Sequence, residues 1–396
     1  MLATQDAAAP SPTGPSRRLV SVMAVATGVA AANLYYAQPL LGAMARSLSL
    51  PVAALGLVAT LAQIGYALGL LFLTPLGDVH PRRPLIVALL LAVTLPLAGM
   101  ALAPSLATLA LASLSLGLLT VTPQVVVPLA AALSPDAGRG RVVGTVMSGL
   151  LIGVLLTRTV SGAVAGMLGW RTVYWLAAAA SAGLALVLWR ALPLEGRPAR
   201  VAYADLLRSV AALARRQPAL RQAAISGAAL FGAFSVFWTT LTFYLASPPW
   251  HLGPAAIGLF GLAGLAGATA APIAGRLADR RGPRVMVGGA LLVALAAFGA
   301  LGLLSGRLWG VAVGAAVLDL GVQSGQISNQ TRIYALLPEA KSRVNTVYMV
   351  GYFIGGAIGS GAGTLAWHAG GWPAALGAGA LLLVVGLLAH VPRRGI

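Results

Sequence analysis

The sequence of 396 residues contains no cysteine and only eight acidic residues. The absence of cysteine excludes disulfides and thiolate metal sites, although it leaves the redox compartment open. No glycine-rich loop ending in lysine is present, so the phosphate-binding motif of ATP-driven proteins is missing. No combination of serine, histidine and acid indicates an enzyme, and we expect no cofactor. The histidines are too scattered to predict a metal site: they are His80, His251, His368 and His390.

Charged residues of both signs are scarce, at 9% of the chain, whereas 59% of the residues are hydrophobic and the mean hydropathy is +0.89. Soluble domains carry about 25% charged residues. A surface this apolar requires lipid as its solvent. In a soluble protein the net charge of +18 would suggest a nucleic-acid partner. In a chain that requires lipid, the location of the charge matters more than its sum, so we expect a lipid bilayer and no nucleic-acid partner.

Twelve apolar stretches are long enough to cross a bilayer as helices, which takes about 20 residues each. The sequence therefore predicts an all-α membrane protein with twelve transmembrane helices in two pseudo-symmetric six-helix bundles. The predicted spans are residues 19–43, 53–77, 84–103, 106–132, 141–168, 172–192, 222–247, 255–278, 285–304, 308–334, 343–368 and 373–391.

This count divides the chain into five parts. They are a disordered tail (1–18), an N-terminal bundle (19–192), a linker (193–221), a C-terminal bundle (222–391) and a short tail (392–396). Within the linker, Tyr203–Arg216 has leucine and valine on one side and most arginines off it. This pattern predicts either a short amphipathic helix on the membrane surface or a solvated linker.

Most lysines and arginines fall on one side of the twelve-helix arrangement, and only Arg46, Arg171 and Arg307 fall at loops on the other. Positively charged loops stay in the cytoplasm. We therefore expect both termini and the linker to be cytoplasmic.

Two charged hairpins recur about half a chain apart. Residues 74–83 (TPLGDVHPRR) reappear in fuller form as residues 275–284 (GRLADRRGPR). Gly169-Trp170 recurs as Gly371-Trp372 at a similar spacing. The protein is therefore a duplicated bundle, an architecture suited to moving a substance across a bilayer.

Small residues recur every four positions in the fifth and eleventh spans, which places each set on one helical face. Such faces let helices approach closely. We expect tight packing, and we also expect that the two halves rock along these faces. The sets are Gly149, Gly153, Thr157 and Ser161, and Gly351, Gly355, Gly359 and Gly363.

The hairpins resemble the signature loop of the major facilitator superfamily, which lies between helices 2 and 3 and recurs more weakly between helices 8 and 9. The first copy departs from the family pattern at Thr74, Val79 and Pro81. In the family, these loops latch the cytoplasmic side while the transporter faces outward. The resemblance therefore assigns a cytoplasmic gate to Asp78, Arg82, Arg83 and Arg141 in the first half and to Asp279, Arg280, Arg284 and Arg343 in the second.

Residues 33–41 (NLYYAQPLL) resemble the first helix of the bacterial drug:proton antiporters with twelve helices and of the sugar-efflux permeases. Two other antiporter motifs are altered. Ser113 stands where the fourth helix usually carries arginine, and Thr157-Arg158 stands where the fifth usually carries glycine and proline. The resemblance implies a location in the bacterial inner membrane.

Only Arg158 and Asp319 place charge deep within the predicted spans. A charge at the bilayer centre costs from about 2.5 to more than 10 kcal/mol, so it faces a cavity or a partner. These two residues either pair with each other as a structural element or serve the transport cycle. Asp319 is the one deep carboxylate, and we expect it to couple transport to protons, with Arg158 as its partner.

Asp319 begins a polar stripe with spacings of four, three and four residues, which is one face of the tenth helix. In the superfamily, helices 1, 4, 7 and 10 line the central cavity. We therefore expect a substrate cavity lined by Asn33, Tyr36, Gln38, Gln63, Tyr66, Gln124, Trp238, Thr239, Gln323, Gln326, Gln330, Tyr348 and Tyr352.

These residues are rich in aromatic rings and amides and poor in charge. We expect a monomeric secondary transporter that exports a small organic, drug-like or amphipathic compound in exchange for protons by alternating access. One alternative is an exporter of sugars or metabolites. Another is an uncoupled facilitator or importer in which Arg158 binds a small carboxylate. A receptor or scaffold would need a large soluble domain or a long loop, and the sequence has neither.

Overall fold

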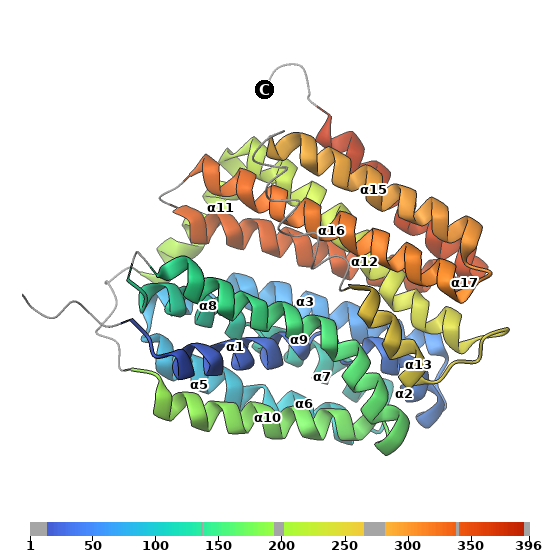
Figure 1. Ribbon diagram of the computed structural model, residues 1–396, viewed down its shortest axis with the longest axis horizontal. Helices are drawn as coiled ribbons and strands as arrows, with labels where there is room; N and C mark the ends of the chain where they lie inside the picture. The colour runs from blue at the N-terminus through green and yellow to red at the C-terminus, as the bar shows by residue number, and fades with distance from the viewer. Residues whose placement is uncertain (1–13, 136–137, 194–201, 265–281, 338–339, 392–396) are drawn as a thin grey trace, which may run out of the picture.

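The computed structural model describes residues 14–135, 138–193, 202–264, 282–337 and 340–391. All regular secondary structure in these ranges is helical. Nine of the described helices are long and apolar enough to cross a membrane. They lie side by side along the long axis of the molecule, with the blue and green N-terminal elements on one side and most of the yellow to red C-terminal elements on the other (Figure 1). The exception is the short helix α13 (Pro254–Leu259), which lies against α9 of the N-terminal half.

The N-terminal half begins with a helix that is interrupted in the middle. α1 is followed, after Asn33–Ala37, by the short helix η1, which contains Pro39, and by α2. Proline residues also lie near the breaks between other consecutive helical segments. Proline has no backbone N–H to donate to the preceding turn, so it interrupts a helix. The helices are α1 (Arg17–Ala32), η1 (Gln38–Leu40), α2 (Leu41–Ser47), η2 (Val52–Leu55), α3 (Gly56–Phe72), α4 (Leu76–Val79), α5 (Arg82–Ala92), α6 (Thr94–Leu102), α7 (Leu106–Leu119), α8 (Thr122–Ala132), α9 (Arg139–Leu168) and α10 (Trp170–Ala191).

The C-terminal half follows a linker helix, α11 (Tyr203–Arg216), in which only Val210 is buried. The hydroxyl of Tyr203 donates a hydrogen bond to the backbone carbonyl of Phe72 at the end of α3, 2.7 Å away, while α11 also packs on α12 and α17. The remaining helices are α12 (Pro218–Ala246), α13 (Pro254–Leu259), η3 (Phe260–Ala263), α15 (Pro283–Leu304), α16 (Leu308–Leu336) and α17 (Lys341–His390).

The internal repeat is visible in the backbone. α17 is a run of 50 residues broken at Gly370 and Gly371, so it forms two spans. Gly371 has φ 63°, and Gly169, its counterpart between α9 and α10, has φ 86°. Both values lie in the left-handed region that favours glycine. Each glycine is followed by a tryptophan that starts the next span, as the repeat predicts.

The small-residue faces hold helices together within each half. A Cβ added at Gly149 or Gly153 of α9 would overlap backbone atoms of α1, and one at Gly355 or Gly359 would overlap α12. The tight packing that we expected is present. The contacts between halves run elsewhere, through α9 with α13 and α3 with α17, so the expectation that the halves rock along the small-residue faces is wrong.

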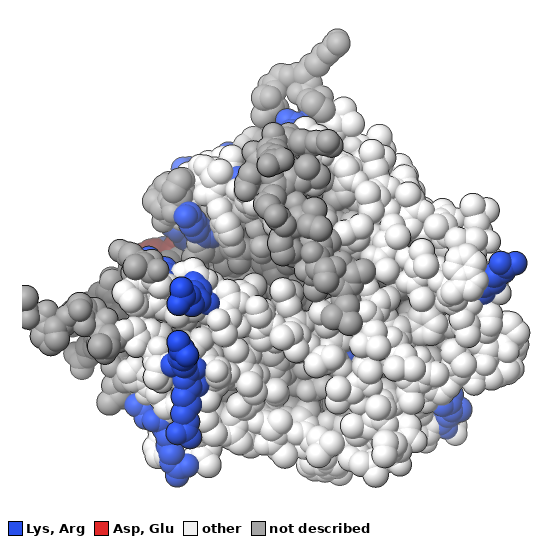
Figure 2. Space-filling view, in the orientation of Figure 1, with Lys and Arg blue, Asp and Glu red and all other residues white. Residues whose placement is uncertain are grey.

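Positive charge gathers at one end of the described bundle, with few lysines or arginines at the other (Figure 2). Hydrogen bonds tie helix ends together there. The guanidinium of Arg83 donates to the carbonyl of Trp189, and that of Arg332 donates to Gln222 Oε1, 2.6 Å away. At the opposite end, Arg171 donates to Ser47 Oγ and to the carbonyl of Ala103. We call the first end the arginine-rich end.

Candidate functional site

The break in the first span brings two side chains against α9. The N–H groups of Asn33, Leu34 and Tyr35 donate three residues back rather than four, which ends the α-helical pattern. Irregular backbone within a membrane is tolerated where it is buried in protein or lines a wet cavity. The break places Tyr35 and Gln38 next to Arg158.

Arg158 is buried between the two halves, with only 2% of its surface exposed. Its Nε–H donates to Gln38 Oε1 at 2.7 Å. Its guanidinium carbon lies 4.0 Å from the ring centroid of Trp238, 5.2 Å from that of Tyr35 and 5.4 Å from that of Phe234. Three rings therefore surround the cation, an arrangement that attracts a guanidinium through the ring quadrupoles. Its Nη2 is buried and makes no hydrogen bond.

Asp319 is 5% exposed and accepts a hydrogen bond from the indole N–H of Trp238, with 3.3 Å between Nε1 and Oδ1. Its other oxygen packs against η3, where a Cβ added at Gly264 would lie 2.8 Å from Oδ2. No nitrogen of Arg158 comes within 4.0 Å of its carboxylate among these described side chains. Trp238 thus stands between the two charges, with its ring face toward Arg158 and its N–H toward Asp319.

The rest of the polar stripe on α16 faces the first arm of α17. Gln326 Oε1 accepts from the hydroxyl of Tyr352 at 3.4 Å, and Gln330 Nε2 lies 4.0 Å from Met349 Sδ. Gln323 is half-buried between them and Asp319. This part of the stripe therefore lies on the face of α16 that contacts α17.

A second group of predicted residues crosses between the halves at α3 and α17. Gln63 Nε2 donates to Ser360 Oγ at 2.9 Å, and Gln63 Oε1 accepts from Ser235 Oγ at 3.3 Å. Ser360 Oγ also lies 3.2 Å from Thr239 Oγ1. These bonds join one helix of the N-terminal half to two helices of the C-terminal half.

Aromatic rings continue this contact toward the arginine-rich end. The ring of Tyr66 lies 4.3 Å from that of Phe353 between centroids, and its hydroxyl accepts from Gln124 Nε2 at 3.2 Å. Tyr352 stacks on Phe231 at 4.2 Å and lies 5.9 Å from Tyr348, which is fully buried. The structure brings these predicted residues into one region.

The structure places Tyr36 away from this region, with its ring edge-on to Tyr174 of α10. Tyr35 takes the position beside Arg158 instead. Tyr35, Phe234 and Ser360 were not among the predicted cavity residues. The signal available for Tyr35 was Pro39, which marks a disturbed helix and so weakens any assignment of faces by helical periodicity.

The predicted gate residues are dispersed over the arginine-rich end. Asp78 is paired with Arg82 of its own hairpin, 4.0 Å apart, and the charge of Arg343 from α17 also acts on it. Arg83 is held by the carbonyl of Trp189, and Arg141 is exposed at the start of α9. Arg284 is exposed and donates to the carbonyl of His390 at 3.3 Å. Asp279 and Arg280 lie outside the described residues.

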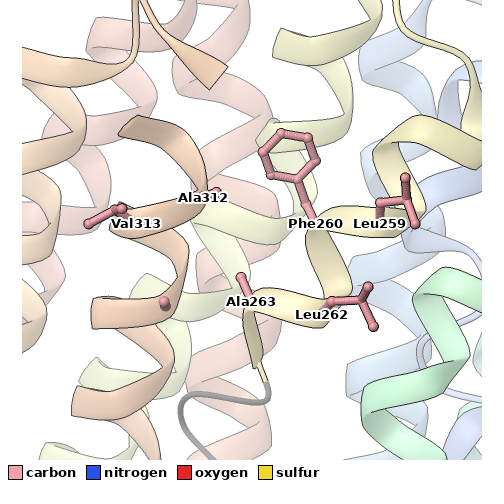
Figure 3. A pocket seen from close by; sticks show the side chains of 7 residues that line it. Leu259, Phe260, Leu262, Ala263, Ala312 and Val313 are labelled. Carbon is pink, nitrogen blue, oxygen red and sulfur yellow. The ribbon is translucent and has the colours of Figure 1, made fainter. Parts of the chain in front are cut away.

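An apolar pocket of about 510 Å³ lies between η3 and α16 (Figure 3). Two of its residues, Ala312 and Ala316, precede Asp319 by seven and three positions, so they belong to the same stripe of α16. Leu259 and Val313 on its rim are about half exposed. The pocket therefore has an apolar lining that includes two positions on the stripe of α16 that leads to Asp319.

Comparison with known proteins identifies the family to which this protein belongs. Residues 23–251 and 224–395 each match the family described as Major Facilitator Superfamily, and this chain belongs to that family. It is a secondary transporter and not an enzyme. It is 44% identical over 373 residues to the "Uncharacterized transporter YgaY" of Escherichia coli O157:H7, covering 94% of this chain and 95% of that one. It is 37% identical over 391 residues to the "Probable transporter SCO4007" of Streptomyces coelicolor, covering 97% and 90%.

Solved structures share the fold at low sequence identity. The bacterial homologue of the human lysosomal transporter Spinster, in an inward-facing and occupied conformation, aligns with a TM-score of 0.72 at 14% identity, over 94% of this chain and 95% of that one. The human organic anion transporter MFSD10 aligns with a TM-score of 0.71 at 19% identity, over 96% and 100%. The predicted fold class is confirmed. The division of the chain into its five parts and the roles of the site residues stay predictions.

Proposed function

We propose that this protein couples export of a small organic compound to proton movement, with Asp319 as the group that takes up and releases the proton. The observation that carries the proposal is the burial of Asp319 between the halves on a single hydrogen bond from Trp238. Ionisable residues inside a membrane mark ion and proton paths by default.

The other described acids do not share this position. Asp78 and Asp205 have partly exposed carboxylates and pair with arginines of their own helices or hairpins. Asp319 has no ion pair within the described chain, so its charge is compensated only by the indole N–H and by Arg158 across the ring of Trp238. A carboxylate in this position changes its protonation when its surroundings move.

The aromatic and amide character of the region favours a substrate that is largely apolar. The pocket between η3 and α16 supports the same choice because all of its lining residues are apolar. The distribution of arginine supports an inner-membrane orientation with the arginine-rich end, both termini and α11 on the cytoplasmic side.

The test is transport by proteoliposomes across a panel of organic compounds, with and without an imposed pH gradient. We expect Asp319→Asn to abolish gradient-driven transport while substrate exchange across the membrane continues, because exchange needs no net proton movement. Asp205→Asn, a carboxylate that is exposed on α11 and paired with Arg208, should leave both activities unchanged. Gradient-driven transport by Asp319→Asn at the rate of the unaltered protein would disprove the proposal.

A further inference from the structure

We propose that Arg158, held apart from Asp319 by Trp238, binds the single anionic group of a substrate with a planar aromatic body. This inference rests on the proposed transport function and names the substrate class at the same site.

The first argument is the incomplete pairing of Arg158. One nitrogen is satisfied by Gln38, but Nη2 is buried without a partner. A buried charge that lacks hydrogen bonds destabilises a protein. Such an unpaired buried donor is retained in a protein when it binds a ligand. The ligand that best matches the hydrogen-bond donors of a guanidinium is a carboxylate or a similar oxyanion.

The second argument is that Asp319 does not form an ion pair with Arg158. The N–H of Trp238 binds one carboxylate oxygen, and the other oxygen packs against Gly264. The ring face of the same tryptophan covers the guanidinium at 4.0 Å. A single side chain therefore engages both charges and prevents the direct ion pair that would consume the free donor.

The third argument concerns the surroundings of the donor. Tyr35, Phe234 and Trp238 face the guanidinium, so a ligand bound there meets aromatic rings. One cation and a set of rings suit a monoanion with an aromatic body, whereas a second charge on the ligand would have no partner.

The experiment measures binding to the purified full-length protein in detergent at one neutral pH by calorimetry. The probes are benzoate, phenylacetate and indole-3-acetate, each compared with its neutral amide. We expect at least one acid to bind about tenfold or more tightly than its amide, because removing one member of a buried charge pair costs this much or more. Equal binding of acid and amide, or no saturable binding of any of the three acids, would overturn the proposal.

Variants separate the roles of the three residues. Arg158→Gln should abolish the preference for the acid. Arg171→Gln should keep it, although Arg171 also stacks on a tryptophan, with 4.3 Å between its guanidinium carbon and the ring of Trp170. An unchanged preference in Arg158→Gln would contradict the proposal, and the comparison of acid with amide on the unaltered protein stands even if that variant fails to fold.

Trp238→Phe keeps a ring beneath the guanidinium but removes the N–H that holds Asp319. We expect acid binding to weaken several-fold, because the carboxylate is then free to pair with Arg158. The double variant Trp238→Phe/Asp319→Asn should restore it, which a purely structural role of the tryptophan does not predict. A double variant that binds the acid no better than Trp238→Phe would refute this role of Trp238.

These outcomes are independent of the proton-coupling test. If acids and amides bind alike while Asp319→Asn still abolishes gradient-driven transport, proton coupling stands and the anion site falls. If acids bind through Arg158 while Asp319→Asn transports normally on a gradient, the anion site stands and proton coupling falls.

Discussion

Gly264 has no side chain at the point where the carboxylate of Asp319 packs against η3. A methyl group there would lie 2.8 Å from Asp319 Oδ2 and 2.8 Å from Leu155 Cδ2. Both of these atoms are ends of side chains, so the fold can adjust while the carboxylate is displaced. The absence of a side chain at Gly264 thus fixes the position of the acid rather than the path of the backbone.

We therefore expect Gly264→Ala to lower gradient-driven transport several-fold and to lower the unfolding temperature only slightly. The displaced carboxylate loses its hydrogen bond to Trp238, and one such bond contributes about 1 kcal/mol. Gly299→Ala, in open space on α15, is the matched control and should transport normally. Transport by both variants at the same rate would show that the carboxylate tolerates the added methyl group.

Some residues of the site could be predicted from the sequence and others could not. Arg158 and Asp319 were identifiable because a charge in an apolar run is rare and therefore informative. Trp238 was selected only as one of many cavity residues, since its position between the two charges depends on three helices that are remote in sequence. Tyr35 was confused with Tyr36 because the faces of a broken helix do not follow the helical period.

At the scale of helices, apolar runs bounded by arginine or glycine predicted the ends of most observed helices closely. The span expected at residues 106–132 is α7 with α8, and the one expected at 308–334 is α16, which ends two residues later. The internal breaks were not predicted, since they depend on local hydrogen bonding rather than on hydropathy. The pairing of helices was not predicted either, because a small-residue face does not specify its partner.

The contact between α1 and α9 provides the element-scale prediction. A methyl group at Gly153 would overlap the carbonyl oxygen of Gly28, which is backbone and cannot turn away. We expect Gly153→Ala to lower the free energy of unfolding by about 1–3 kcal/mol, the usual cost of overpacking. Thermal unfolding in detergent measures it.

Gly144→Ala on the same helix is the control, since nothing lies within 4 Å of the added methyl group. It should be neutral or slightly stabilising, because alanine favours a helix over glycine. Equal stability of the two variants would mean that α1 and α9 separate without cost.

For the whole molecule, the absence of cysteine makes the contact between halves directly testable. At the end opposite the arginine-rich end, a Cβ at Gly42 of α2 would lie 3.6 Å from that of Ala246 at the end of α12. This distance suits a disulfide. The same end is also held by the hydroxyl of Thr242, which donates to the carbonyl of Gln38 at 2.7 Å.

We expect the pair Gly42→Cys/Ala246→Cys to block transport on oxidation and to recover on reduction, because alternating access requires this end to open. The control pair Gly99→Cys/Ala112→Cys joins α6 to α7 within one half at 3.4 Å and should cross-link without loss of transport. Full transport by the oxidised Gly42/Ala246 pair would rule out movement of the halves at this end.

One hydrogen bond connects the linker helix α11 to the N-terminal half. The helix packs on α12 and α17, yet Tyr203 binds the carbonyl of Phe72 in the other half. When the halves part at the arginine-rich end, α11 cannot follow both. Either the bond from Tyr203 breaks or α11 separates from α12 and α17, so opening that end requires the loss of one of these contacts.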